Sequence, residues 1–122
     1  MDPKELEART KRFAVNIVKF VGNWPKGKIF DVIGYQLLKS GTSIGANHRE
    51  ANRAQSYSDF IHKIGIVEKE ASETQFWLEI CDDRSLGHEA QRKWLLNESG
   101  QLLAIFTAAG KTAKERKNRF GR

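Results

Sequence analysis

The stretch FIHKIGIVEKEASETQFWLEIC, Phe60 to Cys81, carries the most regular pattern in the sequence. Small or apolar side chains recur in it at alternating steps of four and three residues, at Phe60, Ile64, Val67, Ala71, Thr74, Leu78 and Cys81. This spacing places them on one face of an α-helix, and its repetition over three heptads is typical of helices packed side by side. The preceding Ser56-Tyr57-Ser58-Asp59 predicts a capping box, and Asp82 to Gly87 predict a turn after the helix.

Three more helices are predicted around this one. Asp2-Pro3-Lys4-Glu5 combines an Asp cap with proline in the first turn, so the first helix begins there and ends near Gly22-Asn23. The second helix ends near Arg53, and the last is apolar from Trp94 to Ala109 with an interruption at Ser99-Gly100. Strand signals are absent. The sequence therefore predicts an all-α, up-down-up-down antiparallel four-helix bundle over residues 1–110, followed by a frayed or disordered basic tail over residues 111–122.

Length and composition suit one self-sufficient domain. The chain has 122 residues, enough for a single hydrophobic core. Its one cysteine, Cys81, excludes an internal disulfide and fits a reducing compartment. No secretory signal pattern opens the sequence and no apolar run is long enough to span a bilayer, so we expect a soluble cytoplasmic protein without a membrane partner.

Charge is segregated along the sequence, with a formal net charge of +6. Residues 1–53 carry 10 Lys/Arg against 5 Asp/Glu, residues 54–110 carry 5 against 9, and residues 111–122 carry 6 against 1. The candidate nucleic-acid contacts are the basic residues at the end of the second helix and in the tail: His48, Arg49, Arg53, Lys111, Lys114, Arg116, Lys117 and Arg119. The alternative interpretation is a solvated face with a solubilising tail.

The segment SGTSIGANHREA, Ser40 to Ala51, places Gly41 and Gly45 inside the second helix. Each interior glycine costs about 1 kcal/mol relative to alanine. Two glycines four residues apart lie on one line of the helix, where a second backbone can approach closely and offset that cost. Asn47 needs hydrogen-bond partners if it is packed there. The neighbouring helix offers His62, Lys63 and Glu70.

A second stripe runs beside the core face of the third helix. It consists of Ile66, Glu70, Glu73, Trp77 and Ile80, with Phe76 further round. One buried stripe is sufficient for a bundle helix, so a second one indicates self-association. The alternative is that Phe76 and Trp77 cover the edge of a broad core.

No residue pattern supports catalysis, a metal or a cofactor. A di-iron bundle requires Glu-x-x-His, and the nearest match, Asp59-x-x-His62, lies at a helix start where Asp is expected as a cap. His48, His62 and His88 are scattered, and the glycines of Ser40 to Asn47 lack the lysine of a phosphate loop. Cys81 falls on the core face and is interpreted as a small buried hydrophobe.

Four segments together resemble the four helix bundle protein family, whose members include proteins encoded within intervening sequences of bacterial 23S ribosomal RNA genes. They are Ser40 to Asn47, Glu50-Ala51, Asp59 to Ile61, and Glu68 to Leu78, within a match from about Phe13 to Ala109. The sequence is also similar to the accessory variability protein of diversity-generating retroelements, a basic pentamer that binds nucleic acid and a reverse transcriptase.

The resemblance implies a ring-shaped homopentamer with no established enzymatic activity. The residues that carry over by position, with structural and intersubunit roles, are Ser43, Asn47, Glu50, Glu70, Glu73 and Trp77. With Gly41 and Gly45 they form the predicted structural or oligomer-interface set. The basic stretch after Gly110 is not part of the family pattern. The sequence therefore predicts a non-enzymatic oligomer that binds nucleic acid, RNA before DNA, through charge and shape, and the alternative is an oligomeric adaptor for a protein partner.

Overall fold

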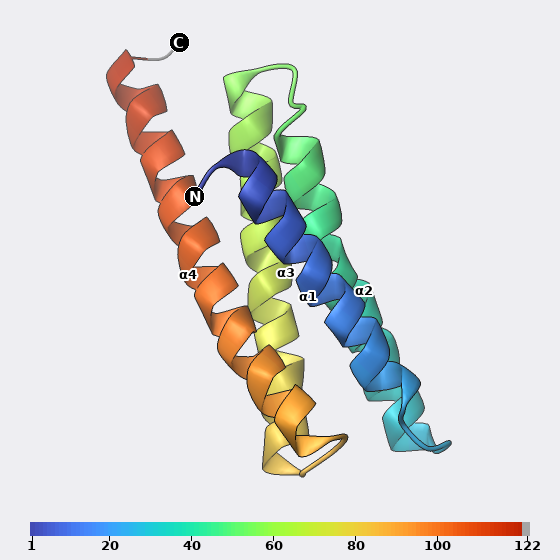
Figure 1. The fold of residues 1–122 in the computed structure, drawn as a ribbon. Helices are drawn as coiled ribbons and strands as arrows, with labels where there is room; N and C mark the ends of the chain where they lie inside the picture. Colours follow the sequence, from blue (N-terminus) through green and yellow to red (C-terminus); the bar gives the residue numbers. More distant parts are fainter. Residues whose placement is uncertain (121–122) are drawn as a thin grey trace.

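The computed structural model describes residues 1–120, which form four α-helices and no strand. The helices are α1 (Pro3–Gly22), α2 (Lys28–Ala51), α3 (Tyr57–Asp83) and α4 (Glu89–Phe120). They run alternately up and down beside one another (Figure 1), which confirms the predicted all-α four-helix bundle. Within residues 1–120, no helix combines the length and the apolar character that crossing a bilayer requires.

Local sequence signals account for the helix starts. The Asp2 carboxylate accepts the backbone N–H of Glu5 at 2.8 Å, and Pro3 stands at the first helical position. The Ser56 hydroxyl accepts the N–H of Asp59 at 3.0 Å. The reciprocal bond differs from the standard capping box, because the Asp59 carboxylate accepts from Gln55, one residue before the cap, at 3.4 Å.

The core is built from one face of each helix. From Ile64 to Cys81 every member of the α3 stripe is at most 2% exposed, and only Phe60 at the helix start is half-buried. Three fully buried aromatic residues, Phe13, Phe20 and Phe106, pack against this stripe in one cluster. Burying such side chains contributes roughly 1.5–3 kcal/mol each, so this cluster dominates the stability of the bundle.

The α2 glycines lie where α2 meets α1. A Cβ atom on Gly41 would lie 2.8 Å from Ile17 Cγ1, and one on Gly45 would lie 3.3 Å from the backbone carbonyl of Thr10. A larger residue at either position would therefore push α1 away. Contact between two helices of the same chain offsets the helix-propensity cost of these glycines.

Helix α4 differs from its prediction in two places. It continues through Ser99-Gly100, because Ser99 is fully buried and its hydroxyl donates to the carbonyl of Leu96 at 2.9 Å. It also continues through the basic stretch to Phe120, and Ala113 is only 4% exposed. The expectation of a frayed or disordered tail is thus wrong for residues 111–120, while residues 121–122 lie outside the described part of the chain.

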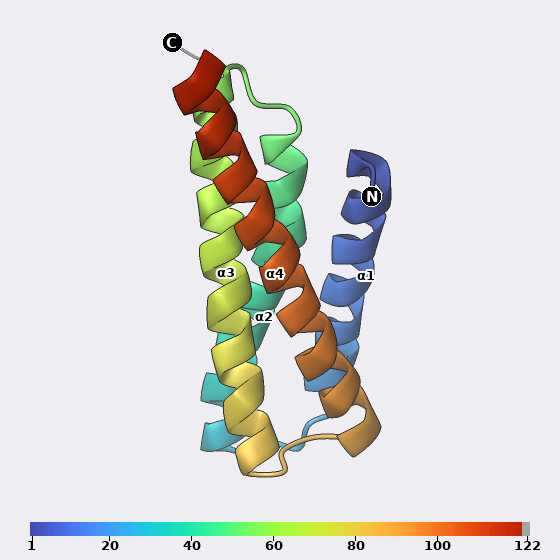
Figure 2. The same cartoon turned by 90° about the vertical axis from the view of Figure 1, so that its left-hand side faces the viewer.

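The two ends of the bundle are closed to different degrees. The closed end holds the α1–α2 connection (residues 23–27) and the α3–α4 turn (residues 84–88). The open end holds the α2–α3 connection (residues 52–56) and the last turns of α4. The contact between α1 and α4 is the smallest helix contact in the bundle, and α4 leans away from α1 toward the open end (Figure 2).

Candidate functional site

Seven of the eight predicted basic contacts gather at the open end. Arg49 lies in the last turn of α2, Arg53 lies in the connection to α3, and the other five lie along the end of α4. Lys117 joins two of these elements, because its ammonium donates to the Ser58 hydroxyl at the start of α3 over 2.6 Å. The fold thus brings together cations from segments about sixty residues apart in sequence.

His48 is the exception and is not a surface contact. It is 3% exposed, and its ring meets Phe106 edge to face at 5.1 Å between centroids. Burial lowers the pKa of His48, while the negative charge of Glu7 opposes that shift. Its Nδ1 atom is buried and has no hydrogen-bond partner among residues 1–120. A phosphate group cannot reach this imidazole, so its prediction as a nucleic-acid contact is wrong.

Most of the remaining cations are exposed to solvent. Arg53, Lys111, Lys114 and Arg116 are exposed and form no ion pair within 4.0 Å to any carboxylate in the described part of the chain. Arg49 lies 3.8 Å from a Glu7 oxygen on α1. This arrangement leaves several guanidinium and ammonium groups available to an anionic partner.

An open groove of about 740 Å³ lies at the same end of the bundle as these cations. Small and apolar side chains make up most of its wall, including Ala51, Ala54, Phe60, Ile105, Ala108 and Ala109. Arg116 lines one side of it, and Tyr57 stands 44% exposed with its ring stacked on Phe60. The sequence pattern shows these alanines but not the groove, because the groove depends on where α1 begins relative to the end of α4.

The predicted structural set divides between two contacts. Gly41 and Gly45 face α1, whereas Ser43 and Asn47 bond within α2. The Asn47 amide donates to the Ser43 carbonyl at 2.8 Å, and the Ser43 hydroxyl donates to the Lys39 carbonyl. The predicted bond from Asn47 to His62, Lys63 or Glu70 on α3 is therefore not formed among the described residues. Glu50 is exposed and lies 3.9 Å from Lys63.

On α3, the other members of this set lie on a half-buried face. Burial raises the pKa of Glu70, and the negative charge of Glu73 raises it further. Trp77 packs against the core, and its Nε1–H is buried without an acceptor among residues 1–120. The neighbouring Phe76 remains 53% exposed. Unlike the open end, this face combines apolar exposure with carboxylates.

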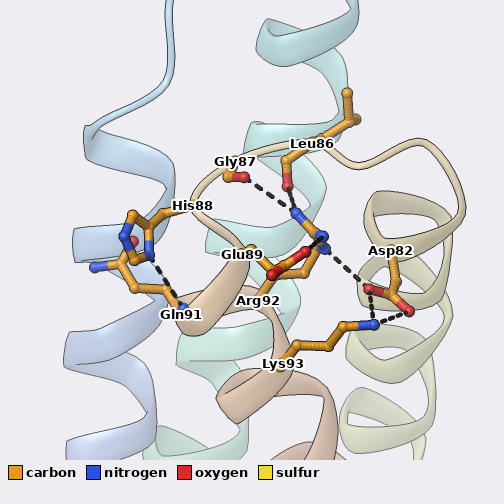
Figure 3. Close-up of polar contacts among 8 residues, drawn as sticks. All are labelled: Asp82, Leu86, Gly87, His88, Glu89, Gln91, Arg92 and Lys93. Atoms are coloured by element: carbon orange, nitrogen blue, oxygen red, sulfur yellow. Dashed lines mark hydrogen bonds and ion pairs between the residues drawn. The ribbon is translucent and has the colours of Figure 1, made fainter.

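A polar cluster at the closed end was not predicted from the sequence (Figure 3). Arg92 is 4% exposed, and its guanidinium donates to the carboxylate of Asp82 at 2.9 Å and to the carbonyls of Leu86 and Gly87 at 3.1 Å each. Lys93 also binds Asp82, and these two cations lower the pKa of that carboxyl, Lys93 first. The Arg92 donors are directed at acceptors within the turn, so we interpret this cluster as a structural clamp.

The remaining candidates for redox and metal chemistry are the Cys81 thiol and the potential metal ligands. Cys81 is fully buried, and burial raises the pKa of its thiol to about 11, which keeps it protonated at neutral pH. Within residues 1–120, no three His, Cys, Asp or Glu side chains converge in a way that could hold a metal ion.

Comparison with known proteins shows similarity to a protein family and to a solved structure. The family model for 23S rRNA-intervening sequence proteins matches residues 5–108. The chain is 38% identical to a protein of unknown function from the S23 ribosomal protein family of Bacteroides thetaiotaomicron VPI-5482. That match covers 91% of this chain and 99% of the other, with a TM-score of 0.79. No curated protein matches the sequence.

Proposed function

This chain belongs to the 23S rRNA-intervening sequence protein family, and from that premise we propose that it is a non-enzymatic nucleic-acid-binding protein of the bacterial cytoplasm. It binds RNA, or DNA with lower preference, through the basic surface of its open end and without reading base sequence. The binding form is a homo-oligomer, a ring of five copies being the expected assembly.

The observation that carries this proposal is the convergence of cations on one end of the bundle. Arg53 and the exposed cations of α4 come from different segments, yet they lie at the same end of the bundle, where Arg116 lines the groove. Long flexible cations positioned in this way suit phosphate contacts, which give affinity and orientation but no sequence specificity. The family match ends at residue 108, so Arg49 and Arg53 lie within the matched region and the cations from Lys111 onward lie beyond it.

Oligomerisation is supported by the α2–α3 face. Ile29 and Val32 on α2 are 63% and 53% exposed, and Phe76 on the adjacent α3 is 53% exposed. Trp77 on that side has a buried Nε1–H without an acceptor among residues 1–120. A neighbouring copy that covers this face would bury its exposed apolar side chains, as interface cores do. Several copies would also multiply the phosphate contacts available to one nucleic acid.

The experiment is a binding titration of a fluorescein-labelled 23S rRNA stem-loop, with a DNA duplex of equal length, across a salt series. We expect binding that weakens log-linearly with salt, with a slope of about −0.9 per phosphate contact on a duplex. Size-exclusion chromatography with light scattering on the same sample gives the number of copies. No binding of either nucleic acid at low salt would contradict the proposal.

Two charge variants locate the contact surface. Lys111→Gln with Lys114→Gln removes two exposed cations of the open end, and Lys26→Gln with Lys28→Gln removes two exposed cations of the closed end. We expect the first pair to reduce the magnitude of the salt slope by about 2 per subunit engaged and the second to leave it unchanged. Equal losses would show that only net charge matters. Substitution is preferable to truncation, because Ala113 belongs to the core.

The second candidate function is an adaptor for a protein partner, and the groove at the open end is the observation that favours it. An apolar groove of this size is a common feature of protein and peptide binding sites. Because neither Lys111 nor Lys114 lines the groove, substitution of these two lysines should weaken the binding of a protein partner less than it weakens the binding of nucleic acid.

A further inference from the structure

The groove at the open end lies in line with α1, beyond the first residue of that helix. Lower in the bundle, Arg9 of α1 donates to both carboxylate oxygens of Glu98 on α4, at 2.7 and 2.9 Å, and to Gln101 at 2.8 Å. The two helices are antiparallel, so counting seven residues each way from this pair brings Asp2 level with Ile105. Helix α4 therefore runs on beyond the first residue of α1 (Figure 1).

Beyond the start of α1, only α2, α3 and α4 continue, whereas all four helices pack together lower in the bundle. The groove follows α4 from Ile105 to Arg116, which is about 16 Å at 1.5 Å per residue, or three helical turns. The ends of α2 and α3 form its other wall, through Ala51, Ala54 and Phe60. The space thus has the length and the surroundings of a missing helix, and no residue of the described chain fills it.

The side chains along the groove permit a close helix contact. On α4 they are Ala108, Ala109, Thr112 and Ala113, and facing them are Ala51 and Ala54. Helix axes packed on residues of this size approach to the short end of the usual 8–10 Å range. Unpaired bases would find a poorer surface, because the one exposed ring of the groove wall, Tyr57, is already stacked on Phe60.

The charge around the groove selects the kind of helix. Arg116 lines it, and Arg53, Lys117 and Arg119 lie at the same end. Of the nearby carboxylates, Glu7, Glu50 and Asp59 already lie within 4 Å of Arg49 or Lys63, and Glu115 is exposed on α4. Two copies of this chain meeting at this end would bring like charges together, whereas a helix with acidic flanks would match them.

We propose that the groove binds an acidic amphipathic helix of a partner protein, which takes the position of a fourth helix beyond the start of α1. Its apolar face lies on the alanines, and its carboxylates pair with Arg116 and the neighbouring cations. This interaction does not depend on nucleic-acid binding. Where both occur, the helix neutralises the cations that would contact phosphates, so the two partners compete for the open end.

The test uses a fluorescein-labelled synthetic peptide of about 18 residues, long enough to cover the groove with one helical face. Leucines are spaced at three and four residues on one face, and glutamates fill the other. Two control peptides have the same composition in scrambled order and lysine in place of glutamate. Fluorescence anisotropy with the full chain at physiological salt should give saturable, micromolar binding of the acidic amphipathic peptide, and binding at least about tenfold weaker for both controls.

Matched substitutions place the peptide in the groove. Ala108→Trp fills it, and Ala104→Trp puts the same side chain one turn earlier on α4, where the alanine is also exposed but does not line the groove. We expect Ala108→Trp to weaken peptide binding at least about tenfold and Ala104→Trp to change it less than about twofold. Arg116→Glu should weaken it several-fold more than Lys114→Glu. Circular dichroism of each variant verifies that the fold is intact.

Each contrary outcome identifies another occupant or none. Absence of binding by the acidic peptide, equal binding of the scrambled peptide, or equal loss in both tryptophan variants overturns the proposal. If Ala108→Trp changes the mass of the assembly and leaves peptide affinity intact, a second copy occupies the groove. If Ala108→Trp weakens only the binding of a single-stranded oligo(dT) probe, unpaired nucleotides occupy the groove. If the protein binds the peptide but no RNA, only the proposal of nucleic-acid binding is contradicted. If it binds RNA but not the peptide, only the proposal of a helix-binding groove is contradicted.

Discussion

The closed and open ends of this bundle differ in how far their own residues cover them. At the closed end, Arg92 binds the carbonyls of the α3–α4 turn, and Trp24 packs edge to face on both Phe20 and Phe30. At the open end, a groove lined by several alanines and Arg116 lies near further exposed cations. The same four helices thus supply one end that is covered by its own turns and another whose surface is suited to a partner. Stability and binding are therefore expected to respond to substitutions at different ends.

The largest effect is expected from Gly87 in the α3–α4 turn. It has φ +77°, and an added Cβ would lie 2.5 Å from both Phe20 Cε1 and Trp24 Nε1. Gly87→Ala combines a disfavoured backbone with a clash against the core, so we expect a loss of about 3 kcal/mol or more in the free energy of unfolding. Urea denaturation followed by circular dichroism measures it.

Gly22→Ala is the control at the same end. A Cβ there would meet no atom within 4 Å, so we expect a change below about 1 kcal/mol. Equal effects at the two glycines would show that the closed end is not held by the tight packing of Phe20, Trp24 and Gly87.

The next effect is expected from Arg92, the clamp of the same turn. Arg92→Met keeps the length of the aliphatic part but leaves the Leu86 and Gly87 carbonyls without their donor, while Asp82 keeps its bond from Lys93. Losing the partner of buried acceptors costs about 1–3 kcal/mol each, so we expect a total near 3 kcal/mol. Lys93→Met, which removes an exposed partner of the same carboxylate, should leave the urea midpoint unchanged within error. Similar losses in the free energy of unfolding for both variants would show that the surface ion pair, rather than the buried guanidinium, stabilises the turn.

A smaller effect is expected at the open end from the cap of α3. Ser56→Ala removes the hydroxyl that accepts the Asp59 N–H, and loss of such a cap costs about 1 kcal/mol. Ser56→Asp keeps an acceptor and should retain most of that stability. If Ser56→Ala instead proved as damaging as Arg92→Met, the open end would be as tightly constrained as the closed end.

Periodicity and cap chemistry were sufficient to predict the four helices, because both are encoded within a few residues. The α3 stripe and the Ser56 cap are local signals, and the structure contains both. Ser99-Gly100 misled the α4 prediction because the small residues there serve a contact with α3, where a Cβ on Gly100 would lie 3.3 Å from Gln75 Nε2. A local break and a close helix contact have the same sequence signature.

The candidate site was less predictable for two physical reasons. His48 was grouped with Arg49 by charge, although Leu37, Gly41, Ile44, His48 and Ala51 follow the same four and three spacing that marks a core face, and all five are buried. The groove has no signal within any single helix. It arises from the register between α1 and α4, which Arg9 and Glu98 fix from positions 89 residues apart.

The smallest effect is expected in the pH dependence of the free energy of unfolding. Its source is the buried imidazole of His48 near the open end, so it tests the difference between the two ends. Burial lowers the pKa of His48 below its ordinary value of 6.5, so the unfolded chain binds a proton at higher pH than the folded chain does. The free energy of unfolding should therefore fall as pH decreases through 6.5, and the fall should end below the pKa of the folded state. His48→Phe, which keeps an aromatic ring against Phe106, should remove this component of the pH dependence.

Denaturant midpoints measured from pH 7.5 to pH 5 for the wild type, His48→Phe and His62→Phe separate the alternatives. His62 is exposed, so its replacement should leave the pH dependence of the wild type intact. A pH dependence that disappears only in His48→Phe identifies the buried imidazole as its source. A slope that persists in His48→Phe would show that the acid sensitivity comes from groups other than the His48 imidazole.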